Sequence, residues 1–280
     1  MKLLKPSVEI CFTSSVFLKI IEKAARTCYK SEDKITSDSH KNMIKRLINK
    51  GHLSPIEHSI LTVKFITDRG VSHELVRHRV ASYSQESTRY CNYSKLGIQY
   101  VIPYWYENIY ENVDSINNDI LNSISIDEIG VKYNLTKKEL DFLIYLDYCE
   151  KEYNKHINIY KEPPQKARLV LPHCIKTEII VSTNFREWRY ILDLRTRKDV
   201  HPQMIQLMYL LCFKLKEEYP EIFELILKPV HFSDIRLESH FFNILCICIE
   251  IIVSLYLEHI GGVFVEVSEE IKNYRTGKKD

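Results

Sequence analysis

The residues best suited to bind an anion lie between positions 77 and 89, where the chain reads Arg-His-Arg-Val-Ala-Ser-Tyr-Ser-Gln-Glu-Ser-Thr-Arg. This segment contains three arginines and no lysine, although lysine is abundant elsewhere in the chain. A guanidinium carries five donors in a planar fork, which suits phosphate or pyrimidine recognition better than an ammonium does. Ser82, Ser84 and Ser87 predict a polar turn whose hydroxyls surround the same anion. Anion recognition is therefore favoured over the common alternative, a solvated basic helix end.

Three other kinds of site are poorly supported by the sequence. The seven glycines form no glycine-rich phosphate-binding pattern, so phosphate must be bound by side chains. His73 and His78 nearly match the HExxH zinc motif, but their five-residue separation places them about 140° apart around a helix. Cys174 opens an expected strand, which favours a small buried thiol over a nucleophile. We predict no metal site.

Charge and cysteine content narrow the class of protein. The 39 basic and 37 acidic residues give a net charge of +2, too small to draw the protein onto nucleic acid or an anionic membrane. The eight cysteines include no CxxC pair and the N-terminus has no secretory signal, so we expect a reduced, cytoplasmic protein. Residues 241–265 are apolar but are interrupted by charged side chains, which predicts buried core or a subunit interface rather than a membrane span.

The elements that position the arginine segment are a strand and a helix. Residues 60–67 alternate apolar and polar side chains, which predicts a strand with one buried face. Residues 68–70 are expected to turn the chain, and 71–79 to form a helix. Another strand is expected at 175–181. Helices are expected at 16–28, capped by Ser14 or Ser15, and at 43–48, ending at Gly51. Further helices should start at the capping box of Thr136 and Glu139 and at Pro163-Pro164, and should span 184–194 and 201–218.

The order of these elements predicts the domain organisation. Strands and helices alternate without an internal repeat or a low-complexity linker, which predicts one mixed α/β or α+β domain at residues 1–230. Residues 103–135 are rich in Tyr, Asn, Asp, Ile and Ser, and we interpret them as a loop-rich insertion with one helix. Residues 231–280 are expected to form a C-terminal extension of unknown role.

The arginine segment also resembles a family signature. Arg77-His78-Arg79 followed by Ser82, Ser87 and Arg89 fills every fixed position of RHRxxSxxxxSxR, which is typical of flavin-dependent thymidylate synthases. Six specified residues in thirteen are rarely matched by chance. The resemblance extends over about residues 15–220 and includes the segments at 24–29, 55–58, 167–172 and 194–203. The chain departs from the family at Tyr190, where relatives are expected to have a flavin-contacting Asn.

The resemblance implies a fold and a reaction. The expected fold is a single domain with a central, mostly antiparallel sheet flanked by helices. The expected reaction is reductive methylation of dUMP to dTMP, with methylenetetrahydrofolate as the carbon donor and NADPH-reduced FAD as the hydride donor. Such enzymes need no enzyme nucleophile, so we assign Ser87 to binding. The family also implies a homotetramer with active sites shared between subunits, and no nucleic-acid or membrane partner.

The resemblance also implies roles for individual residues. Arg195 is expected to face the pyrimidine and to stabilise negative charge as it develops there. The alternative for Arg195 is a surface ion pair with Asp193 or Asp199. The residues expected to bind dUMP are Glu74, Arg77, Gln85, Glu86, Ser87, Arg89, Arg168 and Arg195. Those expected to bind FAD are His58, Arg77, His78, Arg79, Asn184, Arg186, Tyr190 and His201.

Two rival functions are compatible with the same arginines. A flavoprotein of another class, acting on a different pyrimidine, would bind FAD without a folate-dependent reaction of dUMP. A nucleotide- or RNA-binding module would use the 18 tyrosines for base stacking, but the near-neutral net charge argues against it. Purification with or without a bound flavin separates these two alternatives.

Overall fold

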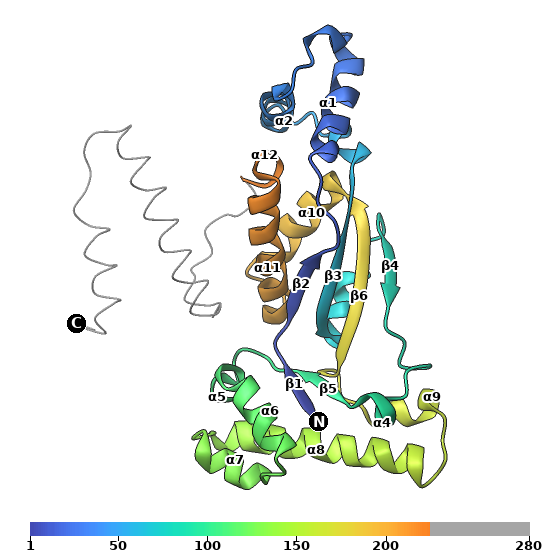
Figure 1. Cartoon of the computed structure of the whole chain (residues 1–280), viewed down its shortest axis with the longest axis vertical. Coiled ribbons are helices and arrows are strands. Elements are labelled where there is room, and N and C mark those ends of the chain that lie inside the picture. Colours follow the sequence, from blue (N-terminus) through green and yellow to red (C-terminus); the bar gives the residue numbers. More distant parts are fainter. Residues whose placement is uncertain (225–280) are drawn as a thin grey trace, which may run out of the picture. The chain divides into compact units, whose positions relative to one another are not determined.

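The computed structural model describes residues 1–224, and its centre is a four-stranded antiparallel sheet with the strand order β2-β3-β6-β4 (Figure 1). The strands are β2 (Ser7–Ile10), β3 (Ile60–Asp68), β6 (Lys176–Asn184) and β4 (Ser82–Gln85). β3 and β6 pair over their whole length, from Ile60 opposite Asn184 to Asp68 opposite Lys176. The predicted antiparallel sheet and the two predicted strands are confirmed.

One face of the sheet packs against helices to form the main hydrophobic core. α10 (Phe185–Arg195) follows β6, and α11 (Pro202–Glu218) packs against both α10 and β2 (Figure 1). Leu61, Val63 and Phe65 of β3 are fully buried, as their alternation predicts. The helices predicted at 184–194 and 201–218 are confirmed by α10 and α11.

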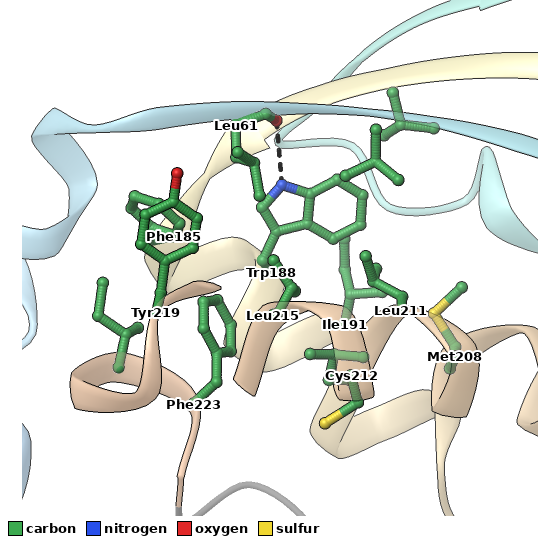
Figure 2. Close-up of a cluster of buried hydrophobic side chains, with 14 of the residues drawn as sticks. Leu61, Phe185, Trp188, Ile191, Met208, Leu211, Cys212, Leu215, Tyr219 and Phe223 are labelled. Carbon is green, nitrogen blue, oxygen red and sulfur yellow. Dashed lines mark hydrogen bonds between the residues drawn. The ribbon is translucent and has the colours of Figure 1, made fainter. Parts of the chain in front are cut away.

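Trp188 of α10 lies in the middle of this core. Its indole is fully buried, and its Nε1–H donates a hydrogen bond of 3.1 Å to the backbone carbonyl oxygen of Leu61 in β3 (Figure 2). Phe65 contributes a tilted ring contact with centroids 6.1 Å apart. A side chain with one polar atom is therefore buried with that atom satisfied, and it joins the helix layer to the sheet.

The N-terminal helices close one end of the main core. α1 (Val16–Tyr29) and α2 (Ser39–Asn49) pack against each other, with η1 (Glu32–Lys34) between them in sequence. α2 leads to η2 (Ser54–His58) and also packs against α12 (Pro220–Phe223). Both predicted helices are confirmed, and Gly51 follows α2 with φ of +71°, the left-handed conformation that favours glycine after a helix.

A second hydrophobic core lies around a parallel pair of short strands. β1 (Lys2–Leu4) pairs with β5 (Gln99–Val101), and the pair packs against the helices between residues 93 and 170 (Figure 1). Those helices are α4 (Tyr93–Leu96), α5 (Glu107–Glu111), α6 (Val113–Leu121), α7 (Ile126–Lys132), α8 (Lys137–Asn158) and α9 (Pro164–Ala167), the last continuing as η3 (Arg168–Val170). The predicted starts of α8 and α9 are confirmed.

The prediction of a loop-rich insertion at 103–135 is wrong, because this segment forms α5, α6 and α7. Each helix is too short to show a long apolar period, so its stability depends on tertiary contacts. Glu139 of α8 provides one: its carboxylate completes the predicted capping box with Thr136 and also accepts the backbone N–H of Asn108 in α5 at 2.8 Å. Asp119 of α6 provides another, since it accepts Lys132 Nζ of α7 at 2.7 Å.

Part of the predicted chain organisation lies outside the described residues. These are the C-terminal extension at 231–280, the end of the predicted domain at 230 and the apolar stretch at 241–265. Within residues 1–224, no helix is both long and apolar enough to cross a membrane.

We expect Trp188→Phe to lower the free energy of unfolding by about 2–3 kcal/mol, because it leaves a cavity and removes the buried hydrogen bond from Nε1 to the Leu61 carbonyl oxygen. Urea denaturation of both proteins measures this difference. Trp105→Phe is the matched control, since Trp105 is 37% exposed and we expect a loss below about 1 kcal/mol. Equal losses in the two variants would contradict the role assigned to Trp188.

Candidate active site

The arginine segment begins where α3 (Arg69–Leu75) ends. Asp68 caps this helix by accepting the backbone N–H of Val71 at 2.9 Å, so residues 68–70 start the helix and do not form the separate turn that we predicted. The helix also stops at Leu75, short of the predicted end at 79. The chain beyond α3 is irregular, and it buries His78 while leaving Arg77 and Arg79 exposed.

Arg195, at the C-terminal end of α10, reaches the C-terminal end of α3. Its Nε donates to His78 Nε2 at 2.9 Å, its Nη1 donates to Glu74 Oε2 at 3.1 Å, and its Nη2 donates to the Glu74 carbonyl oxygen at 3.0 Å. The structure therefore brings together Glu74, His78 and Arg195, three of the predicted site residues. The alternative ion pair with Asp193 or Asp199 is not formed, and Asp199 pairs with Arg197 instead.

His78 is held in its neutral form. Burial, with the positive charge of Arg195 as a second cause, lowers the pKa of His78 to about 4. Because Nε2 accepts a hydrogen bond from Arg195, the ring proton of the neutral imidazole must lie on Nδ1. Tyr190, half exposed on α10, meets the His78 ring edge-on with centroids 6.3 Å apart.

Tyr83 of β4 fastens the chain between α3 and the sheet. Its hydroxyl donates to the carbonyl oxygens of Leu75 at 3.0 Å and His78 at 2.5 Å. Burial and the carboxylate of Glu187 raise the pKa of Tyr83 to about 12, so the hydroxyl remains a donor. Sequence reasoning missed Tyr83, because it occupies an unspecified position of the motif. A tyrosine between two serines is nevertheless typical of an edge strand, and this pattern could have indicated β4.

The polar turn that we predicted from Ser82, Ser84 and Ser87 is only partly formed. Ser82 and Ser84 belong to β4, whereas Ser87 starts a turn in which its carbonyl oxygen accepts the backbone N–H of Tyr90 at 3.2 Å. Residues 82–85 pair with β6, and Ser82 and Ser84 lie on the exposed face of this edge strand. Gln85 lies on the other face, where its Nε2 donates to Ser72 Oγ of α3 at 2.8 Å and to Thr177 Oγ1 at 3.1 Å. An edge strand tolerates this polar composition because only one of its sides is paired.

Glu86, predicted to bind the substrate, makes its contacts within the protein. Its carboxylate accepts the hydroxyl of Tyr93 at 2.8 Å, Lys176 Nζ at 2.9 Å and the backbone N–H of Glu178 at 3.2 Å. Its backbone carbonyl accepts Arg69 Nη1 at 3.2 Å. These contacts make Glu86 an anchor for the residues that follow it. Neither partner was predicted. Lys176 meets Glu86 because β4 pairs with β6, which is distant in sequence, and Tyr93 lies in α4, beyond the end of the motif.

The next residues present a second group of predicted contacts. Arg168 Nη1 donates to Thr88 Oγ1 at 3.1 Å, which brings η3 to the end of the arginine segment. Ser87 Oγ accepts the backbone N–H of Arg89 at 3.3 Å. Arg89 and Arg168 are exposed and form no ion pair within residues 1–224. No hydrogen bond or ion pair in this part of the chain joins the group to Arg195.

A third group lies at the opposite end of α10. Asn184 caps that helix by accepting the backbone N–H of Glu187 at 2.8 Å, so its side-chain oxygen has a structural role besides the predicted flavin contact. Arg186 pairs with Glu57 of η2, next to the exposed His58. His201 lies apart from this group, before α11, with its ring centroid 6.1 Å from that of Trp105.

The site can bind and polarise anions but has no evident nucleophile. Ser87 has no histidine or carboxylate within hydrogen-bonding distance in the described residues. Burial, and then the charge of Asp68, raise the pKa of the Cys174 thiol to about 12, which keeps it protonated at neutral pH. Among residues 1–224, no three His, Cys, Asp or Glu side chains gather as metal ligands would.

Comparison with known proteins identifies relatives of this chain. The profile of the family described as thymidylate synthase complementing protein matches residues 14–221. The flavin-dependent thymidylate synthase of Corynebacterium diphtheriae is 28% identical to this chain over 207 residues, which cover 73% of this chain and 77% of the relative. That of Mycobacterium leprae is 29% identical over 210 residues, which cover 73% of this chain and 78% of the relative. The crystal structure of Thymidylate Synthase X from Helicobacter pylori with FAD and dUMP has the same fold, with a TM-score of 0.60, 22% identity, and coverage of 80% of this chain and 100% of that one.

We predict that His78 makes the protein less stable as pH falls from about 6.5 to about 4. Between these values the unfolded chain binds a proton at His78 and the folded chain does not, so the free energy of unfolding falls with pH. A His78→Asn variant, which cannot bind that proton, should lose less stability than wild type over this window in urea titrations at several pH values. Parallel curves for the two proteins would show that His78 is not the group responsible.

Proposed function

We infer that this chain, which belongs to the thymidylate synthase complementing protein family, is a flavin-dependent thymidylate synthase that uses FAD and acts on dUMP. The structural observation that supports this function best is the placement of Arg195. A guanidinium is held by His78 and Glu74, so its charge has a defined position and orientation. Such a group suits a reaction in which negative charge develops on a pyrimidine ring.

Arg195 is proposed to face the pyrimidine of dUMP. Three of its five N–H groups are used within the protein, and the two remaining Nη hydrogens are available to a ring oxygen or nitrogen. The neutral His78 accepts one bond without cancelling the charge, which leaves Glu74 as the counter-ion. Arg195 thus supplies electrostatic stabilisation, and neither Ser87 nor Cys174 is activated as a covalent catalyst.

Ser87, Arg89 and Arg168 are proposed to bind the phosphate of dUMP. The two guanidiniums have no carboxylate partner within residues 1–224, so their charges are available to a dianion. Thr88 orients Arg168, and the contacts of Glu86 with Lys176 and Tyr93 hold the segment that carries Ser87. Gln85 is proposed to lie beside the nucleotide. Glu86 is better supported as an anchor than as a ligand.

The donor set also fits FAD. Arg77 and Arg79 are exposed and form no ion pair in the described part of the chain, as residues that bind a pyrophosphate should. His58, Asn184 and Arg186 gather at the start of α10, and Tyr190, further along this helix, contacts the ring of His78. When bound, reduced FAD supplies the hydride to the uracil ring. We extend the proposed flavin contacts to His201 on the family resemblance.

The remaining parts of the reaction follow from the family resemblance. NADPH is proposed to reduce the flavin, and methylenetetrahydrofolate to supply the carbon. A cytoplasmic homotetramer with shared active sites is proposed as the working assembly.

The first test of the function is the visible spectrum of the protein with FAD, recorded during titration with dUMP. We expect a bound-flavin spectrum that dUMP changes saturably, followed by dTMP formation when NADPH and methylenetetrahydrofolate are added. Arg195→Ala should fold and bind flavin but lose about 100- to 1,000-fold in kcat, the usual effect of removing one preorganised donor. Arg197→Ala, an exposed arginine two residues later, is the control and should retain activity.

Each other outcome favours a different function. A protein that binds FAD but does not convert dUMP in the presence of folate would be a flavoprotein of another class. A protein that binds no flavin under any condition would be a nucleotide-binding module. Full activity of Arg195→Ala would remove this residue from the site.

Shared active sites are tested by mixing two inactive variants. We expect Arg89→Ala and Arg195→Ala to be inactive separately and to recover dTMP formation after the subunits exchange, because some mixed sites receive both native arginines. Light scattering should give the mass of a tetramer for each variant. Absence of recovery despite measured exchange would place both arginines of a site in one subunit.

A further inference from the structure

A basic pocket that the proposed site does not use is lined by residues of α1, η1 and α2 and of the segments that join them. Figure 1 shows α1 and α2 at one end of the main core. Its volume is about 440 Å³, which is within the range of small-molecule sites. Four of its nine lining residues are Lys or Arg, and none is acidic. Such a pocket is suited to a small anion, provided that its cations are not already neutralised.

Three of the cations are not neutralised by other groups in the described part of the chain. Arg26 is paired with Glu22 at 3.0 Å, but Lys34, Arg46 and Lys50 form no ion pair within residues 1–224. Arg46 uses only its Nε, which donates to the Asn42 carbonyl oxygen at 3.3 Å and leaves the two Nη groups available. The pocket therefore carries about three unbalanced positive charges.

The helix ends do not account for these charges. Both α1 and α2 end at the pocket, and cations are common near helix C-termini. However, the last carbonyls already accept backbone donors, Ser31 N–H to Arg26 at 3.2 Å and His52 N–H to Leu47 at 2.9 Å. The side chains of Lys34, Arg46 and Lys50 are thus not needed as caps.

The rim of the pocket offers a planar group next to these cations. The hydroxyl of Tyr29, a half-exposed residue, lies 2.8 Å from Nδ1 of His52, so the two rings hold each other in place. Met43 and Leu47 form an apolar floor. Rings beside an apolar floor and a cluster of cations are the features that bind a nucleobase and its phosphate together.

We propose that this pocket binds the 2′-phosphoadenosine end of NADPH, an inference that rests on the proposed function. The phosphate would lie among Lys34, Arg46 and Lys50, and the adenine against Tyr29 and His52. An arginine beside the ribose is the usual means of selecting NADPH over NADH. The position is also suitable, because His52 leads directly into η2, which ends at His58, a proposed flavin contact.

Calorimetry on the purified full chain tests the binding. Adenosine 2′,5′-bisphosphate should bind at least tenfold more tightly than adenosine 5′-monophosphate, which lacks the 2′-phosphate. Arg46→Gln and Lys50→Gln should each reduce that preference about tenfold, the effect of losing one hydrogen bond to a charged group. Lys41→Gln removes the same charge from the exposed side of α2 and should leave the preference unchanged.

Flavin reduction gives a second readout. For wild type and Lys41→Gln, kcat/KM for bleaching of the flavin should be higher with NADPH than with NADH, and in Arg46→Gln and Lys50→Gln the ratio should fall about tenfold. Equal binding of the two adenosine ligands, or an unchanged ratio in both pocket variants, would overturn the proposal. Because calorimetry requires no turnover, bisphosphate binding by a protein that forms no dTMP would separate failure of the proposed function from failure of the pocket.

Discussion

The antiparallel pairing of β3 with β6 is the constraint on which the rest of the structure depends. α3 starts where β3 ends, at Asp68, and α10 starts where β6 ends, at Asn184, so the two helices begin at opposite ends of one ladder. Nine paired residues extend about 30 Å, and helices of 7 and 11 residues extend about 10 and about 16 Å. Helices that run back along this ladder meet near their C-terminal ends, which places Arg195 beside Glu74.

The charges at this meeting point complement each other. The Glu74 carbonyl oxygen at the end of α3 accepts a hydrogen bond from Arg195. The partial negative charge of a helix C-terminus favours a cation at this position. A protonated His78 would repel the same guanidinium, and burial adds to that cost, so the imidazole remains neutral and serves as an acceptor. The result is a fixed positive charge that keeps donors available for a ligand. Preorganisation of this kind requires no movement when charge develops on a substrate.

The motif residues illustrate the limit of reading a sequence by position. Arg77, His78 and Arg79 are adjacent in the chain, yet α3 ends at Leu75 and the irregular segment turns His78 inward and both arginines outward. Glu86 belongs to the same motif region, but its carboxylate is directed to Lys176 because β4 pairs with β6. Residue type indicated anion chemistry, whereas strand pairing and burial decided which groups meet the anion and which support the site.

The sequence by itself determined the elements with strong local patterns and the chemistry of the arginine segment. Alternation at Leu61, Val63 and Phe65 and the capping box at Thr136 depend on neighbours in the chain, and the arginines carry their charge in any fold. Only the tertiary structure decided β4 and the helices α5–α7, because short elements depend on partners that are distant in sequence. It also decided that Arg195 contacts Glu74 and His78, since a contact between residues more than 100 positions apart leaves no local pattern to read.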